Sequence, residues 1–265
     1  MKTHRELMLE EMGLAPTWHL RAQAPAAVEA ERETQSGNVR SNAEGDALEI
    51  IAQRLTPHPS PLTPSNDRRS SIMRMDWNGL RASVAACTAC PLHAKRNKTV
   101  FGVGDENADW LFVGEGPGAD EDAQGEPFVG QAGKLLDGML AAIHLKRGSN
   151  VYIANVVKCR PPGNRNPAPD EALACEPYLH RQIELLQPKL IVALGKVAAV
   201  NLLAREASVA SLRGKLHEYR GIPLIVTYHP AYLLRSLHDK AKAWVDLCYA
   251  VETMQGLQSG KSVTT

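Results

Sequence analysis

The stretch WLFVGEGPGADEDAQGEPFVG, residues 110–130, decides the fold that the sequence predicts. It opens with five apolar residues, which is the length and composition of a buried strand. Glycines, prolines and acids follow at once, and these residues are typical of a loop. Strands that are apolar throughout are typical of parallel sheets with helices on both faces. We therefore predict a buried strand over residues 110–114 that leads into a polar loop.

The same alternation of apolar runs and helical patterns continues along the chain. It predicts further strands at 151–157, 190–194 and 224–227, and helices at 77–86, 133–144, 169–186, 196–204 and 240–256. The order of these elements predicts an α/β fold, a three-layer αβα sandwich around a small central parallel sheet. Since sites in such sheets lie beyond the carboxyl ends of the strands, we expect the loops after these four strands to meet at one edge.

Composition divides the chain into three parts. Residues 73–257 form the predicted folded domain, and residues 258–265 form a disordered tail. Residues 1–72 are a low-complexity extension that we expect to be mostly disordered, and its last part, residues 56–71, is rich in proline and serine, which predicts a linker. Two short amphipathic segments in this extension are either surface helices or docking helices for a partner protein.

The charge balance and the cysteine count limit the class of protein. The chain has 30 Lys+Arg against 29 Asp+Glu, which excludes a globally basic nucleic-acid binder but not a local basic surface. No apolar run reaches the roughly eighteen residues of a membrane span, and the first residues do not resemble a secretory leader. Five cysteines is an odd number. We therefore expect a cytoplasmic protein with reduced or metal-bound thiols rather than a disulfide framework.

Four cysteines are candidate metal ligands. Cys87 and Cys90 form a C-x2-C pair, Cys159 follows the second predicted strand, and Cys175 lies on the next helix. Four thiolates can hold a cubane iron–sulfur cluster or a zinc ion, and the spacing does not decide between them. The alternative is a redox pair with two ordinary buried cysteines. Cys248 lies among apolar residues of the last helix and is interpreted as a core residue.

The loops after the first two strands carry further candidates. Glu115 and Glu121 belong to an acidic loop, which is a solvated surface, a divalent-metal site, or a source of carboxylates beside a reacting sugar. Phe128 is either a core residue or a stacking surface for a flat ring. Asn155 interrupts an apolar strand, and its amide is either satisfied in the core or free to hydrogen-bond a base edge.

The segment after the fourth strand, HPAYLLR, predicts a nucleic-acid contact. His229 stands directly at the carboxyl end of the strand. Leu233 and Leu234 are either the first turn of a core-facing helix or an apolar wedge beside a base, with Arg235 on a phosphate. Arg165, in the proline-rich loop after the second strand, adds a basic group to the same edge.

Five motifs together resemble the iron–sulfur (family four) uracil-DNA glycosylases of bacteria and archaea. They are CTACPLH (87–93), GEGPG (114–118), EPFVGQAGKLL (126–136), YIANVVKCRPPGNRNP (152–167) and HPAYLLR (229–235). The resemblance covers about residues 73–257. It implies a monofunctional DNA N-glycosylase of base excision repair. Such an enzyme flips deoxyuridine out of DNA and hydrolyses the N-glycosidic bond to give free uracil and an abasic site.

The resemblance also implies a cofactor and partners. Cys87, Cys90, Cys159 and Cys175 would hold a structural [4Fe–4S] cluster. The protein would be a monomer, bound to the nucleoid when on uracil-containing DNA, with residues 1–72 available to a replication or repair protein. The alternative reading is a non-catalytic iron–sulfur module that binds nucleic acid, and a zinc-bound structural domain is a third.

The roles of the site residues follow from the matching motif positions. Phe128 would stack on uracil, Asn155 would select uracil over cytosine, and His229 would donate to the uracil oxygen on which negative charge builds. Gly116 stands where many uracil-DNA glycosylases carry a water-orienting Asp. We therefore hypothesise Glu121 first, and Glu115 second, for that task.

Two DNA-facing expectations complete the resemblance. Leu233 and Leu234 would fill the gap left by the flipped nucleotide, with Arg235 and Arg165 on the DNA. A related family that also carries an iron–sulfur cluster has an inserted basic loop that bonds covalently to the abasic sugar. The segment between Phe128 and Leu136 has no such insertion, which predicts turnover.

Overall fold

The computed structural model describes residues 65–259. The predictions for residues 1–64, including both amphipathic segments, and for residues 260–265 lie outside this range. No helix of the described residues is long and apolar enough to cross a membrane.

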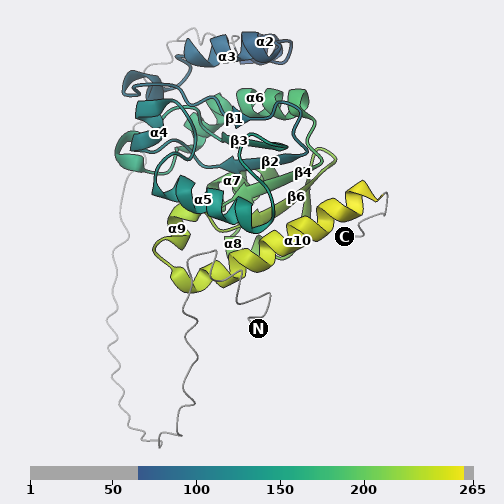
Figure 1. Cartoon of the computed structure of the whole chain (residues 1–265). Helices are drawn as coiled ribbons and strands as arrows, with labels where there is room; N and C mark the ends of the chain where they lie inside the picture. The colour runs from purple at the N-terminus through teal and green to yellow at the C-terminus, as the bar shows by residue number, and fades with distance from the viewer. Residues whose placement is uncertain (1–64, 260–265) are drawn as a thin grey trace, which may run out of the picture.

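A six-stranded mixed sheet forms the centre of the fold (Figure 1). Its strands are β1 (Val103–Gly104), β2 (Trp110–Gly114), β3 (Val151–Asn155), β4 (Leu190–Leu194), β5 (Leu216–Tyr219) and β6 (Ile222–Thr227). The spatial order is β1-β3-β2-β4-β6-β5, and the four central strands are parallel. The predicted parallel sheet is confirmed there, and the antiparallel edge strands β1 and β5 were not predicted.

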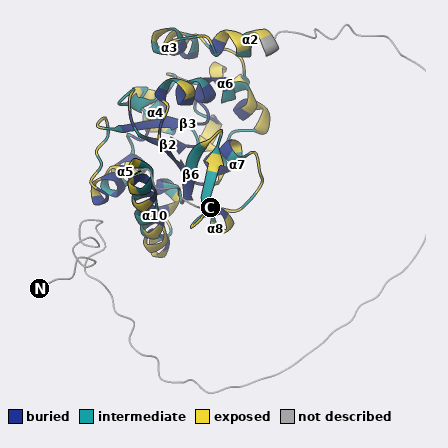
Figure 2. Cartoon of the chain, turned by 90° about the vertical axis from the view of Figure 1, so that its right-hand side faces the viewer, coloured by how far each residue is buried: buried dark blue, intermediate teal, exposed yellow. Residues whose placement is uncertain are grey.

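Helices cover both faces of the sheet. On one face lie α3 (Trp77–Ala85), α6 (Pro169–Leu186) and α7 (Lys196–Leu203), and on the other lie α5 (Gln131–Ala142) and α10 (Lys240–Gln258). Every residue of β2, β3 and β4 is buried, and alternate residues of each strand pack against the two helix layers. Figure 2 shows β2 and β3 in the dark blue of buried residues, between the helices. The predicted αβα sandwich is therefore confirmed.

Short helices lie in the connections near the carboxyl ends of the strands. They are α4 (Ala119–Gln124), α8 (Val209–Leu212), α9 (Pro230–Leu233) and the 3-10 turns Pro91–Ala94, Pro162–Asn164 and Leu237–Asp239. The sequence pattern predicts loops for most of these segments, because three to six residues are too few to show a helical period. Two of them, α4 and α9, frame the candidate site.

The helix α2 (Ser65–Ile72) corrects the predicted start of the folded unit. The composition of residues 65–71 predicts the end of a linker, but Arg68 donates to the carbonyl of Ala174 and Arg69 pairs with Glu176, both on α6. Ile72 is buried against the same layer. The linker prediction is wrong for these residues because the arginines find partners on α6 that composition cannot reveal.

Candidate active site

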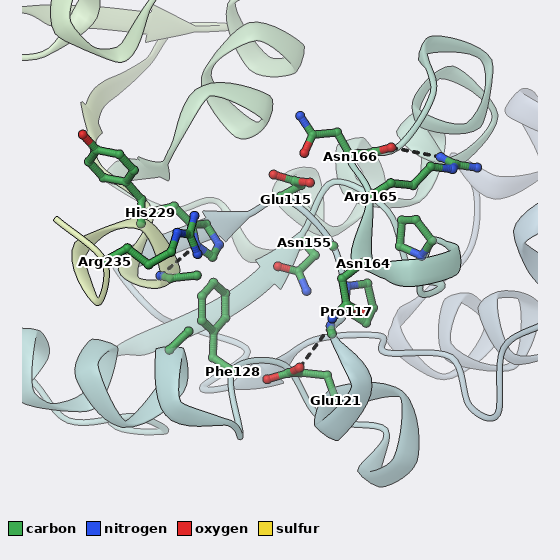
Figure 3. A pocket seen from close by; sticks show the side chains of 16 residues that line it. Glu115, Pro117, Glu121, Phe128, Asn155, Asn164, Arg165, Asn166, His229 and Arg235 are labelled. Atoms are coloured by element: carbon green, nitrogen blue, oxygen red, sulfur yellow. Dashed lines mark hydrogen bonds between the residues drawn. The ribbon is translucent and has the colours of Figure 1, made fainter.

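A cavity of about 410 Å³ opens at the carboxyl ends of β2, β3 and β6 (Figure 3). It brings together most of the side chains that the sequence singled out. These are Glu115, Gly116, Glu121, Phe128, Asn155, Arg165, His229 and Arg235. The convergence that parallel strands predict is therefore present, and we call this cavity the sheet-edge pocket.

Phe128 forms one wall of the sheet-edge pocket. Its ring stacks on the imidazole of His229, with centroids 5.5 Å apart and planes at 29°. The backbone of Phe128 has φ 56°, a left-handed conformation that is uncommon for a bulky residue. Arg147 fastens this segment by donating to the carbonyls of Pro127 and Phe128, at 2.8 Å each. A side chain on Gly133 would overlap the Phe128 carbonyl, so the segment also requires glycine there.

Asn155 ends β3, and its amide oxygen stands out because the described part of the chain offers it no partner. Only 2% of the residue is exposed, and its Oδ1 has no hydrogen-bond partner in residues 65–259. Gly114 is its register partner on β2, and a Cβ there would lie 2.5 Å from Oδ1 and 2.6 Å from Cζ of Phe128. A buried polar atom without a partner is rare. The amide is therefore placed to hydrogen-bond a ligand in the sheet-edge pocket.

His229 caps the amino end of α9 with a defined tautomer. Its Nδ1 accepts a hydrogen bond from the backbone N–H of Ala231 at 3.1 Å. Burial, with a smaller contribution from the nearby positive charge of Arg235, lowers the pKa of His229 to about 4, and the carboxylate of Glu121 opposes this shift. The ring is therefore neutral near pH 7, and because Nδ1 accepts, Nε2 carries the proton.

The two candidate carboxylates differ in what they already bind. Glu121 accepts from Gly118 N at 3.0 Å through Oε2, and from Val129 N at 2.9 Å and Gly130 N at 3.1 Å through Oε1. It therefore links the start of α4 to the two residues that follow Phe128. The carboxylate of Glu115 makes no hydrogen bond or ion pair within residues 65–259, and burial raises the pKa of this carboxyl group. Of the two, Glu115 is the carboxylate left free for a ligand.

The DNA-facing predictions divide. Leu233 is 1% exposed and packs with Met139 and Leu247, so the prediction that it enters DNA is wrong: the helical turn of α9 directs it into the core. Leu234 is 41% exposed and stays a candidate. Arg165 lies at the pocket, but both of its terminal nitrogens donate to the buried carboxylate of Glu171, at 2.8 and 2.7 Å.

Arg235 lines the sheet-edge pocket without an ion pair inside the described range. It is therefore the freer of the two predicted phosphate ligands. Helix α5 starts at Gln131, directly after the loop that holds Phe128. This leaves no room for an inserted loop between them.

All four predicted ligand cysteines line a second, small cavity, which we call the cysteine cavity. Cys159 and Cys175 are buried, and Cys87 and Cys90 are partly exposed. Cys248 lies on α10, which covers the opposite face of the sheet from α6. Within residues 65–259, no group of three or more His, Cys, Asp or Glu is placed to hold a metal ion. The four thiols therefore share one cavity without forming a closed set of metal ligands.

Positive and N–H groups surround the sulfurs of the cysteine cavity. Arg96 donates to Cys159 Sγ at 3.2 Å, and Arg68 donates to Cys87 Sγ at 3.7 Å. The backbone N–H of Lys158 donates to Cys175 Sγ at 3.3 Å. Burial lowers the pKa of the Lys158 ammonium to about 8, and Cys175 and Cys159 oppose this shift. N–H donors and cations are what a group of thiolates requires, so these residues fit a thiolate-bound cofactor.

The fold, the pocket and the cysteines define a class of protein that comparison with known sequences identifies. The family model of the uracil DNA glycosylase superfamily matches residues 101–250, and the chain belongs to this superfamily. A type-4 uracil-DNA glycosylase of Archaeoglobus fulgidus is 48% identical over 159 residues, which are 57% of this chain and 79% of the relative.

Two more relatives carry the same description. The type-4 uracil-DNA glycosylase of Thermotoga maritima is 46% identical over 161 residues, 60% of this chain and 83% of the relative. That of Pyrobaculum aerophilum is 44% identical over 169 residues, 61% of this chain and 86% of the relative. The resemblance that the motifs indicated is therefore confirmed.

Proposed function

We propose that this chain is a monofunctional uracil-DNA glycosylase that releases free uracil from DNA and leaves an abasic site. The observation that carries the proposal is the sheet-edge pocket. There an aromatic ring, a neutral imidazole and an amide whose oxygen has no partner among the described residues face one space. A flipped pyrimidine needs a stacking surface, a reader of its edge and a donor for its leaving oxygen.

The amide of Asn155 gives selectivity. Its Oδ1 accepts from the N3–H of uracil while its Nδ2 donates to the O4 oxygen. Cytosine presents an acceptor and a donor in the reverse order, so the same amide would meet two mismatched groups. Phe128 stacks on the face of the uracil ring, while Asn155 contacts its edge. Gly114, which has no side chain, provides the space for the base to approach.

His229 acts on the leaving group. As the glycosidic bond breaks, negative charge builds on the uracil O2 oxygen, and Nε2–H of the neutral ring donates to it. One such donor in a dry site lowers the barrier by about 3–4 kcal/mol. The imidazole needs no change of protonation state for this task.

Glu115 is the carboxylate we propose for the sugar side, in place of the first hypothesis, Glu121. Its carboxylate can orient the attacking water and stabilise the positive sugar. The space at the next residue, Gly116, is too small for the side chain of an Asp. A Cβ there would lie 2.7 Å from Cγ2 of Val157.

The cysteine cavity would hold the [4Fe–4S] cluster through Cys87, Cys90, Cys159 and Cys175. The cluster supplies a covalent tie between the C-x2-C segment, the end of β3 and α6. On the DNA side, Arg235 would bind a phosphate and Leu234 would enter the gap in the duplex. We further propose that the protein acts as a monomer and that residues 1–72 bind a replication or repair protein.

The test is release of uracil from an oligonucleotide with a single deoxyuridine, read by alkaline strand cleavage, with a thymidine oligonucleotide of the same sequence as the control. We expect cleavage of the uracil strand alone, by a protein whose brown colour reports the cluster. A brown protein that binds the oligonucleotide without cleaving it would instead support the non-catalytic alternative. A colourless, zinc-loaded protein would contradict the assignment of a [4Fe–4S] cluster to the cysteine cavity.

A further inference from the structure

Lys158 lies between the cysteine cavity and the sheet-edge pocket, and only 1% of it is exposed. Its side chain folds back along the chain, and Nζ donates to the backbone carbonyl of Asn155 at 2.9 Å. Nζ also donates to Oε1 of Gln182 on α6 at 2.6 Å. The side chain of Lys158 therefore holds the backbone of Asn155, the residue that would bind the edge of uracil.

Lys158 also contacts the cysteine cavity through its backbone. Its backbone N–H donates to Cys175 Sγ at 3.3 Å, and it directly precedes Cys159. Gln182 is itself held, because its Nε2 donates to the carbonyl of Phe101 at 2.9 Å. Asn155, Lys158 and two of the four cysteines thus form one continuous set of contacts.

The charge of Lys158 has no carboxylate partner within residues 65–259. Both acceptors of Nζ are neutral amide oxygens, which satisfy its hydrogen bonds but do not balance its charge. A buried cation is costly unless a negative group lies nearby. The sulfurs of Cys159 and Cys175 are neighbouring groups that can carry negative charge, since both cysteines line the cysteine cavity together with Lys158 and Cys175 Sγ accepts from the Lys158 backbone N–H.

We propose that Lys158 is a positioning residue whose buried positive charge is balanced by the thiolate-bound cluster and whose ammonium fixes Asn155 for uracil recognition. This inference rests on the proposed function and adds a physical link between the cluster and selectivity. Loss of the cluster would leave an unbalanced charge behind Asn155. The end of β3 that presents the amide would then lose its support.

The test compares Lys158→Met with Arg96→Gln, which also removes a positive charge from the cysteine cavity. Arg96 donates to Cys159 Sγ but makes no hydrogen bond to Asn155. Two quantities are measured on the intact, cluster-loaded protein: the reduction potential of the cluster by film voltammetry, and the affinity for free uracil by calorimetry. The wild-type protein is first shown to be brown and to release uracil, so that a failure of the proposed function is seen separately.

We expect both variants to shift the potential to more negative values, since each removes a nearby positive charge. Only Lys158→Met should also weaken uracil binding, by about tenfold, which corresponds to one lost hydrogen bond to a charged group. An unchanged potential in Lys158→Met would overturn the charge role. Equal uracil affinity in the two variants would overturn the positioning role.

The variant Gln182→Glu tests the same proposal if Lys158→Met does not fold or does not bind the cluster. It places a carboxylate at Nζ and keeps the contact between Nζ and the Asn155 carbonyl. We expect a more negative potential with nearly unchanged uracil affinity. An unchanged potential in Gln182→Glu would contradict the proposal.

Discussion

A Cβ atom on Gly114 would lie 2.5 Å from Oδ1 of Asn155, its register partner across β2 and β3. The two residues end adjacent parallel strands, so the space above Gly114 is the space in front of the amide. Gly114→Ala should therefore lower uracil affinity and the rate of excision by about five- to 150-fold, since overpacking typically costs about 1–3 kcal/mol. Calorimetry with free uracil measures this. Wild-type affinity in the variant would show that uracil does not lie over Gly114.

His229→Ala should lower the single-turnover rate of excision by about two to three orders of magnitude, because it removes the donor to the leaving oxygen. Binding of the uracil oligonucleotide should change much less. A loss below about tenfold would mean that another group, such as backbone N–H donors, stabilises the negative charge.

The depressed pKa of His229 also predicts a pH dependence of stability. Burial lowers this pKa from 6.5 to about 4, so between these values the unfolded chain binds a proton that the folded chain does not. The free energy of unfolding should therefore decrease as the pH falls from about 6.5 toward 4. Urea unfolding of wild type and His229→Gln across this window measures the contribution. An identical slope in both proteins would contradict the assigned shift.

Glu115→Gln and Glu121→Gln should fail in different ways. Glu115→Gln should lower the rate of excision by about a hundredfold or more with little change in Tm, because it removes a carboxylate from the sugar side. Glu121→Gln should mainly lower Tm, since it weakens bonds to three backbone N–H groups. Full activity in Glu115→Gln, together with a large rate loss at an unchanged Tm in Glu121→Gln, would restore Glu121 as the water-positioning residue.

Leu233→Ala and Leu234→Ala form a matched pair on α9. Leu233→Ala should destabilise the fold by about 2–5 kcal/mol because the side chain is buried. Leu234→Ala should leave the unfolding curve unchanged and lower activity on double-stranded DNA more than on single strands, because only a duplex leaves a gap to fill. Equal activity of Leu234→Ala and wild type on duplex DNA would remove Leu234 from the DNA contact.

The parts of the fold that could be predicted are those with a strong local signal. The strands 110–114 and 190–194 and the helix 169–186 have the predicted bounds, because continuous apolar runs and a helical period specify them. The edge strand β1 has only two residues, and β5 reads as the polar sequence LHEY. Neither carries a pattern that separates a strand from a loop.

The candidate site could be predicted as a set of residues but not in its contacts. The carboxyl ends of parallel strands bring Asn155 and His229 together, which topology alone predicts. Nothing in the sequence shows that the carboxylate of Glu121 accepts hydrogen bonds from backbone N–H groups, or that Arg147 donates to the carbonyl of Phe128. The burial of Leu233 likewise depends on the turn of α9. Such contacts join residues far apart in the chain and are visible only in the folded structure.

The central claim is that the amide of Asn155 reads uracil inside the sheet-edge pocket. The most direct measurement is single-turnover base release by wild type and Asn155→Ala, from oligonucleotides that differ only in uracil or cytosine at one position. We predict rapid uracil release by wild type, a loss of about a hundredfold or more in the variant, and no cytosine release by either. Uracil release at the wild-type rate by Asn155→Ala would contradict the account.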